Sequence, residues 1–165
     1  MKLTKKIIDG IEVYFENGVK KYEHRKYNDG FEWWGEYDSK GNNIHFKDSN
    51  VFEWWSEYDN KGNEIHQKTS NGYGWWREYD SKGNEVHYKN IDGNEWWKKY
   101  DSKGNEVHRK DSDGYEVWKE YDNKGNNIHF KDSNGEEWRK IYNPEGEVVV
   151  EEVEVDIEPF TFKKD

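Results

Sequence analysis

The sequence predicts an all-β protein, an elongated antiparallel β-meander of tandem 21-residue hairpin repeats in a single-layer sheet that twists or curls. The first observation behind this prediction is the period: Trp33, Trp54 and Trp75 are 21 residues apart, and glycines from Gly41 to Gly146 keep the same spacing. The second is a pair of turn signals in every copy, which leaves two segments of strand length. Such a fixed period is typical of repeat architectures.

The repeat also sets the predicted organisation. Six copies occupy residues 28–146. Residues 1–27 are expected to form degenerate N-terminal hairpin strands, and residues 147–165 an acidic C-terminal edge strand and tail. A chain of 165 residues suits one continuous domain.

The first turn signal in each copy is Asp38-Ser39-Lys40-Gly41 and its equivalents, which suit a type I turn followed by a left-handed glycine. The second signal predicts two-residue type I′ hairpins at Asn71-Gly72, Asp92-Gly93, Asp113-Gly114 and Asn134-Gly135. Val51 stands where the other copies have glycine, and a β-branched residue resists positive φ, so we expect a distorted hairpin there. Strands of about eight residues joined by alternating three- and two-residue loops account for the period.

Counting from these turns pairs Trp33 with Lys47 and Trp34 with Phe46, and so assigns side chains to two faces. Face A is expected to carry the first tryptophan of each pair together with the Tyr, His and Lys rows. Alternation of Trp and Lys across its strands would permit cation–π contacts.

Face B is expected to carry the second tryptophan of each pair, an Ile/Val row from Ile44 to Ile128 and two acidic rows. It also carries a slot that varies from copy to copy: Phe46, Gln67, Tyr88, Arg109 and Phe130. A uniform repeat cannot recognise an irregular partner, whereas variation at a fixed slot can. Face B is therefore the expected binding face.

Composition limits the function classes. Hydrophobic residues make up 31% of the chain and charged residues 38%, but aromatic residues reach 18%, so folding must rest on buried aromatic surface. The formal net charge is -10. A negative chain is a poor ligand for nucleic acid and a plausible one for a basic protein.

There is no cysteine, which excludes disulfide and thiolate chemistry. The N-terminal sequence MKLTKKIIDGIEVYF is interrupted by charges, so neither a signal peptide nor a membrane span is predicted. We therefore expect a cytoplasmic protein with no membrane partner.

No enzyme is predicted. Histidines 21 residues apart would lie two strands, about 10 Å, from each other, which is too far for shared zinc coordination. We expect these histidines to contact Arg77, Lys98 and Lys119 or to face water. Carboxylate pairs recur in every copy and none is singular, so we expect no catalytic residue, no metal and no cofactor.

The string Tyr-Asp-x-x-Gly-Asn recurs at residues 37–42, 58–63, 79–84, 100–105 and 121–126. It resembles the YD repeat of large Rhs-type toxin proteins, in which such repeats build a β-sheet shell. The fuller unit WWxEYDxxGNxIHxK resembles the Trp-rich repeats of short immunity proteins from bacterial polymorphic-toxin and contact-dependent inhibition systems. Some of those accompany nuclease toxins, including EndoU-type ribonucleases.

This resemblance implies an immunity protein that binds and occludes a toxin domain, a basic nuclease, as a monomer or a 1:1 complex. The alternatives are a carbohydrate or cell-wall binding module and a fragment of a YD-type structural shell. Twelve residues are the candidate partner-binding set: Trp55, Trp76, Trp97, Trp118, Tyr88, Arg109, Glu53, Glu57, Glu78, Glu95, Glu116 and Glu120.

Overall fold

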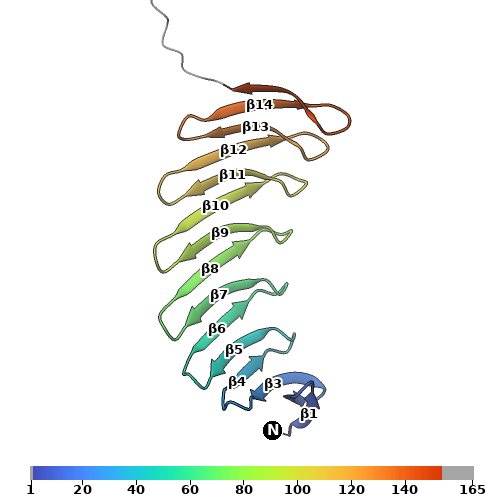
Figure 1. Ribbon diagram of the computed structural model, residues 1–165, viewed down its shortest axis with the longest axis vertical. Helices are drawn as coiled ribbons and strands as arrows, with labels where there is room; N and C mark the ends of the chain where they lie inside the picture. The colour runs from blue at the N-terminus through green and yellow to red at the C-terminus, as the bar shows by residue number, and fades with distance from the viewer. Residues whose placement is uncertain (1, 154–165) are drawn as a thin grey trace, which may run out of the picture. The chain divides into compact units, whose positions relative to one another are not determined.

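The computed structural model describes residues 2–153, in which the secondary structure consists of β-strands and turns. The strands follow one another in chain order (Figure 1). The chain divides into two compact units, one ending at Glu95 and the other beginning at Trp96. The strands are β1 (Thr4–Ile8), β2 (Ile11–Glu16), β3 (Val19–Lys26), β4 (Glu32–Tyr37), β5 (Asn43–Asp48), β6 (Glu53–Tyr58), β7 (Glu64–Thr69), β8 (Gly74–Tyr79), β9 (Glu85–Asn90), β10 (Glu95–Tyr100), β11 (Glu106–Asp111), β12 (Glu116–Tyr121), β13 (Asn127–Asp132), β14 (Glu137–Tyr142) and β15 (Val148–Val153).

Within each unit the strands form one open antiparallel layer. Among the described residues of each unit, strands that follow one another in sequence pack side by side, and no second sheet covers either side. This confirms the predicted all-β meander of hairpin repeats. The predicted C-terminal strand is present as β15, and residues 154–165 of the predicted tail lie outside the described residues.

Both turns of the repeat have the same geometry. In the first, Gly41 N–H donates to Asp38 O at 3.3 Å, and Asp38 N–H donates to Asn42 O at 3.0 Å. The Asp38 carboxylate accepts two further backbone N–H groups, from Lys40 at 2.8 Å and Asn42 at 2.9 Å. Only the glycine has positive φ, 90° at Gly41, as in a type I turn closed by a left-handed residue. The predicted first turn is confirmed.

The predicted two-residue hairpins of the second turn are wrong. Gly72 N–H donates to Thr69 O at 3.0 Å and Thr69 N–H donates to Tyr73 O at 2.8 Å, so the loop has three residues. Asn71 is not among the residues with positive φ, which a type I′ turn would require of it. The side chain at the first turn position favours the longer loop: Asp132 Oδ1 accepts N–H groups from Asn134 and Glu136, both at 2.9 Å.

Val51 fits into this turn without breaking it. Val51 N–H donates to Asp48 O at 3.2 Å, and Asp48 N–H donates to Phe52 O at 3.0 Å, as in the other copies. The expected distortion is therefore absent. Instead Val51 adopts a φ of 61°, in the left-handed region that a β-branched residue disfavours. The strain is concentrated in one backbone angle.

A one-residue register shift follows every first turn. Tyr37 pairs with Asn43 and Glu36 with His45, so Ile44 is an extra residue in β5. The same shift recurs between β6 and β7, β8 and β9, β10 and β11, β12 and β13, and β14 and β15. It is a β-bulge, which places two residues of one strand opposite one of its partner.

The bulge and the longer second loop change the predicted faces. Trp34, not Trp33, pairs with Lys47, and Phe46 pairs with Trp54. The two tryptophan rows still lie on opposite sides, because they alternate along one strand. The His and Lys rows, however, lie with the second tryptophan, and the variable slot lies with the first. The predicted membership of faces A and B is wrong for the strands that follow the first turn.

We name the two sides by residues that define them in each unit. The Tyr face carries Trp33, Trp54 and Trp75, the Tyr row from Tyr37 and the variable slot. The His face carries Trp34, Trp55 and Trp76, the His and Lys rows, and the two Glu rows that contain Glu53 and Glu57 of β6. In the second unit Trp96, Val117 and Arg109 belong to the Tyr face, and Trp97, Trp118 and His108 to the His face.

The buried side chains gather on the Tyr face. The buried hydrophobic residues are Val13, Trp75, Tyr88 and Val117, and the buried polar residues are Ser56, Asn90 and Asp132. On the His face, Trp34, Trp76, Trp97 and Trp118 remain 39–43% exposed. The small core of each unit therefore lies on the Tyr face.

Candidate functional site

The His face is built from a ring stack repeated between neighbouring strands. The rings of His45 and Trp55 lie 5.1 Å apart between centroids with planes 8° apart. The same stack joins His24 to Trp34 at 5.0 Å, His66 to Trp76 at 4.9 Å and His108 to Trp118 at 5.4 Å. It forms because each pair is directly opposite in an antiparallel ladder, where side chains are close enough to touch.

Carboxylates flank the histidines. His87 Nδ1 lies 3.3 Å from Glu78 and its Nε2 lies 2.8 Å from Glu95. His129 lies between Glu120 at 3.2 Å and Glu137 at 2.8 Å in the same way. The expected contacts of the histidines with Arg77, Lys98 and Lys119 are wrong, because these cations lie on the Tyr face.

One acidic row is neutralised by lysines. Lys47 contacts Glu53 at 2.6 Å, and Lys110 contacts Glu116 at 2.6 Å. Hydrogen bonds from Lys110 and then His108 lower the pKa of Glu116 below its ordinary value. Glu95 is held in the same way, first by His87 and then by Lys89, and its pKa is also lowered. These candidate residues are paired within the sheet and contribute little net negative charge to its surface.

The other acidic row is open to solvent. The side chains of Glu57, Glu78 and Glu120 are 70%, 72% and 62% exposed, and each has a histidine nitrogen 3.2–3.3 Å away. Lys99 occupies the same place in β10, opposite His108, and interrupts the acidic row. Glu57 and Glu78 in the first unit and Glu120 in the second are thus the candidate residues best placed to meet a cationic partner.

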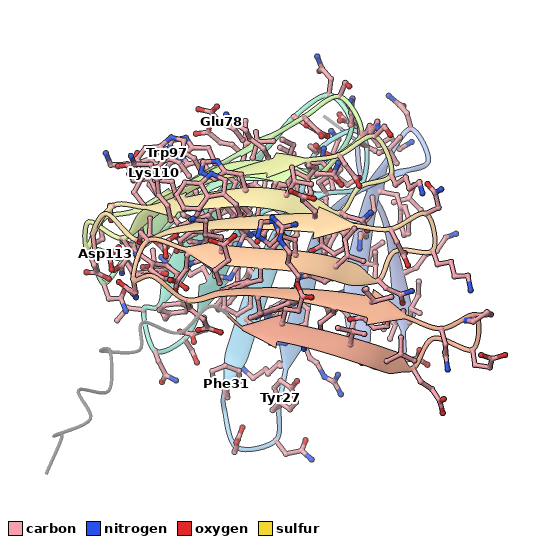
Figure 2. The ribbon with its side chains drawn as sticks, turned by 90° about the horizontal axis from the view of Figure 1, so that it is seen from above. Tyr27, Phe31, Glu78, Trp97, Lys110 and Asp113 are labelled. Atoms are coloured by element: carbon pink, nitrogen blue, oxygen red, sulfur yellow. The ribbon has the colours of Figure 1, made fainter. Side chains whose placement is uncertain are left out.

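Side chains of neighbouring strands contact the tryptophan rings of the His face. Trp55 has the His45 ring on one strand and the Lys68 ammonium, 5.3 Å from its ring centroid, on the next. Trp97 is paired with Lys110 (Figure 2). A predicted contact between the Lys row and tryptophan thus exists at Lys68, but it involves Trp55 of the second tryptophan row and not the first row.

Two of the candidate residues lie on the opposite side from the others. Tyr88 is 8% exposed, with Trp75 6.5 Å from its ring and Arg77 above it. Arg109 donates to both Asp111 oxygens, at 2.6 and 2.9 Å, and its guanidinium lies 5.5 Å from the Trp96 ring. The prediction that Tyr88 and Arg109 share a face with Trp76 and Trp97 is wrong. The bulge shifts the register of β9 and β11 by one residue, so their side chains point to the opposite face.

Residues 2–153 contain no group of three or more His, Cys, Asp or Glu side chains that could hold a metal ion. They also contain no helix that is long and apolar enough to cross a membrane.

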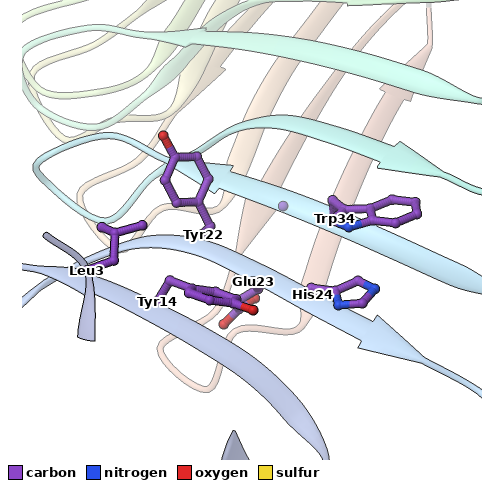
Figure 3. A pocket seen from close by; sticks show the side chains of 7 residues that line it. Leu3, Tyr14, Tyr22, Glu23, His24 and Trp34 are labelled. Carbon is purple, nitrogen blue, oxygen red and sulfur yellow. The ribbon is translucent and has the colours of Figure 1, made fainter. Parts of the chain in front are cut away.

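A pocket of about 270 Å³ was missed from the sequence. It lies at the N-terminal end of the first unit, and Leu3, Tyr14, Tyr22, His24 and Trp34 contribute to its lining (Figure 3). The signal that could have revealed it is a departure from the repeat. Tyr22 lies two residues before a histidine, where the following copies have Asn43, Glu64 and Glu85.

No protein-family model matches this chain, and no curated protein matches it in sequence. Solved structures do share its fold. A crystal structure of TcdB2-TccC3-TEV matches with a TM-score of 0.64 and 12% identity over 87% of this chain and 9% of that one. A crystal structure of TcdB2-TccC3-Cdc42 matches with a TM-score of 0.63 and 11% identity over 94% of this chain and 10% of that one.

The Tc holotoxin pore of Photorhabdus luminescens, with a mutated TccC3, matches with a TM-score of 0.55 and 13% identity over 88% of this chain and 8% of that one. The chain thus spans about a tenth of the length of the structures it matches. At such low identity the likeness is one of fold: this chain is an all-β tandem repeat that resembles a segment of the Tc toxin TcdB2-TccC3.

Proposed function

We propose that this chain is a non-catalytic structural module, a segment of β-sheet wall of the YD-repeat type. The observation that carries the proposal is the fold likeness to a segment of the TcdB2-TccC3 structures over 87% and 94% of the chain. The Tyr-Asp-x-x-Gly-Asn string, which resembles the repeat of Rhs shells, supports the same function.

The internal contacts suit a wall that supports itself. Turn lysines tie each copy to the next: Lys40 Nζ donates to Asn60 O and Lys103 Nζ to Asn123 O, both at 2.8 Å. On the Tyr face, the Tyr58 hydroxyl donates to Asn43 O at 2.9 Å. These bonds join neighbouring copies, so every added repeat reinforces the previous one.

Cross-linking in the organism that encodes the chain tests this function. A wall segment continues at its edge, so amine-reactive cross-links from Lys5 and Lys6 of β1 should reach other β-sheet repeats of the same kind. Cross-links confined to Lys47, Lys89 and Lys110 on the His face, all to one unrelated protein, would instead identify a binding protein and contradict the wall function.

A second candidate function is that of an immunity protein in the cytoplasm, which occludes a basic toxin nuclease such as an EndoU-type ribonuclease. The open carboxylates of Glu57, Glu78 and Glu120 favour it, because exposed charge of one sign accelerates association with an oppositely charged protein. Co-purification with such a toxin, and loss of its nuclease activity in the complex, would support this candidate.

Charge variants sharpen that test. The triple variant Glu57→Gln, Glu78→Gln and Glu120→Gln should slow association with the toxin by about tenfold at low salt. The matched control, Glu64→Gln, Glu85→Gln and Glu106→Gln, removes the same charge from the Tyr face. Equal effects of the two triple variants would show that net charge, and not the open row, attracts the partner.

A carbohydrate-binding module is the third candidate, and the contacts of one expected tryptophan count against it. A sugar ring stacks on a free aromatic face, and the Trp55 ring already lies between His45 and Lys68. Silence on a glycan array would agree with this argument.

A further inference from the structure

The pocket beside β2, β3 and β4 interrupts an otherwise regular surface. Tyr14 pairs with Tyr22, and the neighbouring pair in β3 and β4 is His24 with Trp34. All four rings lie on the His face of the first unit. We propose that this pocket binds an organic cation, an ammonium or guanidinium head group carried by a small molecule or by a partner's side chain.

The rings supply the attraction. Aromatic faces carry a negative quadrupole, and several rings around one space form a site for alkylated ammonium groups. Four rings, together with Leu3, Glu23 and Gly35, line about 270 Å³, slightly below the roughly 300–1,000 Å³ of pockets that hold drug-sized ligands. The size suits a head group and not a whole ligand of that kind. Figure 3 shows Tyr22 and Trp34 along neighbouring strands with Tyr14 and His24 beside them.

Carboxylates next to the lining rings favour a positive occupant, and Glu23 is itself one of the lining residues. Glu12 accepts a hydrogen bond from the Tyr14 hydroxyl at 2.6 Å and lies 3.5 Å from His24. Glu36 is paired with Tyr22 across β3 and β4, and its side chain is 40% exposed. Hydrogen bonds from Lys5, Tyr14 and His24 lower the pKa of Glu12 to about 2, so it stays ionised at neutral pH.

The chain already places one ammonium group against these rings. Lys5 Nζ lies 5.7 Å from the centroid of Tyr14 and forms an ion pair with Glu12. Lys5 therefore competes with an added cation for both the ring and the carboxylate. Removal of Lys5 should therefore strengthen the binding of an added cation. Loss of a residue that only supports the fold would weaken that binding instead.

The test uses the full chain and two probes of equal shape. Choline is cationic, and 3,3-dimethylbutan-1-ol is its neutral isostere. Titrations followed by NMR at the Trp34 indole N–H should show choline binding at least tenfold tighter than the alcohol. N-acetylarginine amide, added in a separate titration, distinguishes a guanidinium side chain from a small quaternary amine as the preferred source of the cation.

Three variants complete the test. Tyr22→Asn removes one of the four rings and should weaken choline at least tenfold; Lys5→Gln should tighten it several-fold. Tyr73→Asn removes an exposed tyrosine elsewhere and should leave binding within twofold. The proposal is overturned if choline and its isostere bind equally, if neither moves the Trp34 signal, or if Lys5→Gln weakens choline binding in a folded protein.

Discussion

The imidazole of His45 lies flat against the indole of Trp55, 5.1 Å away between centroids, and the same contact recurs along the His face. It joins β5 to β6 across the hairpin whose turn contains the left-handed Val51. Ring stacks of this kind contribute beyond the area they bury, by about 0.5–1.5 kcal/mol. In a single-layer sheet with so small a core, such pairs are a main source of cohesion between strands.

A double-mutant cycle measures this stack. His45→Ala and Trp55→Ala should each lower the free energy of unfolding, and their coupling energy should be about 1 kcal/mol. Chemical denaturation of the two single variants and the double variant gives the coupling. His45→Ala combined with Trp76→Ala is the control, because Trp76 stacks on His66 instead and its coupling to His45 should be near zero. Equal coupling in both cycles would show that the stack is not the cause.

Val51→Gly should stabilise the protein. Val51 has a φ of 61°, which costs a residue with a side chain about 1–2 kcal/mol, and glycine removes that penalty at some cost in chain entropy. The expected gain is about 1 kcal/mol in the free energy of unfolding. Asn50→Gly is the control: Asn50 is not among the residues with positive φ, so it should give no gain. A loss of stability in Val51→Gly would show that the valine side chain makes a contact worth more than the strain.

Tyr88→Ala should destabilise far more than Trp76→Ala. Tyr88 is 8% exposed and packs against Trp75, whereas Trp76 is 43% exposed. Truncation of the buried ring should cost about 3 kcal/mol, and truncation of the half-exposed indole about 1 kcal/mol. Thermal or urea unfolding measures both. Unchanged stability of Tyr88→Ala would contradict the assignment of Tyr88 to the core.

Acid should loosen the first turns of the repeat. Hydrogen bonds from Asn63, Asn84, Asn105 and Asn126 lower the pKa values of Asp59, Asp80, Asp101 and Asp122 below their usual value of 3.8. A carboxyl group with a lowered pKa in the folded state stabilises that state above its usual pKa. This contribution is lost as the pH falls from about 4 through the lower folded value.

Replacing these four aspartates with asparagine tests that pH dependence. Asn143 fills the same place in the last copy and still accepts a backbone N–H from Glu147 at 2.8 Å, so the variant should fold. Its unfolding free energy should change less between pH 5 and pH 2 than that of the unaltered chain. An identical pH profile would locate the acid sensitivity in other carboxylates, such as the lysine-bound Glu116.

The sequence by itself determined the strands, their order and one division of the surface. The 21-residue period and the turn residues place every strand, and Trp54 and Trp55 must lie on opposite sides because they are adjacent in one strand. The departure from the repeat at Tyr22 is present in the sequence but was missed, and its meeting with Tyr14 in one pocket required the register of β2, β3 and β4.

The tertiary structure alone decided which rows share a face. Ile44 looks like any other strand residue, yet it is the bulge that moves His45 from the side of Trp54 to that of Trp55. Asn71-Gly72 suits a two-residue loop, yet the loop has three residues. The side chain that precedes such a loop, as at Asp132, accepts backbone N–H groups and so favours the longer form. Side chains alternate with a period of two, so a shift of one residue turns a whole strand over, and composition does not reveal it.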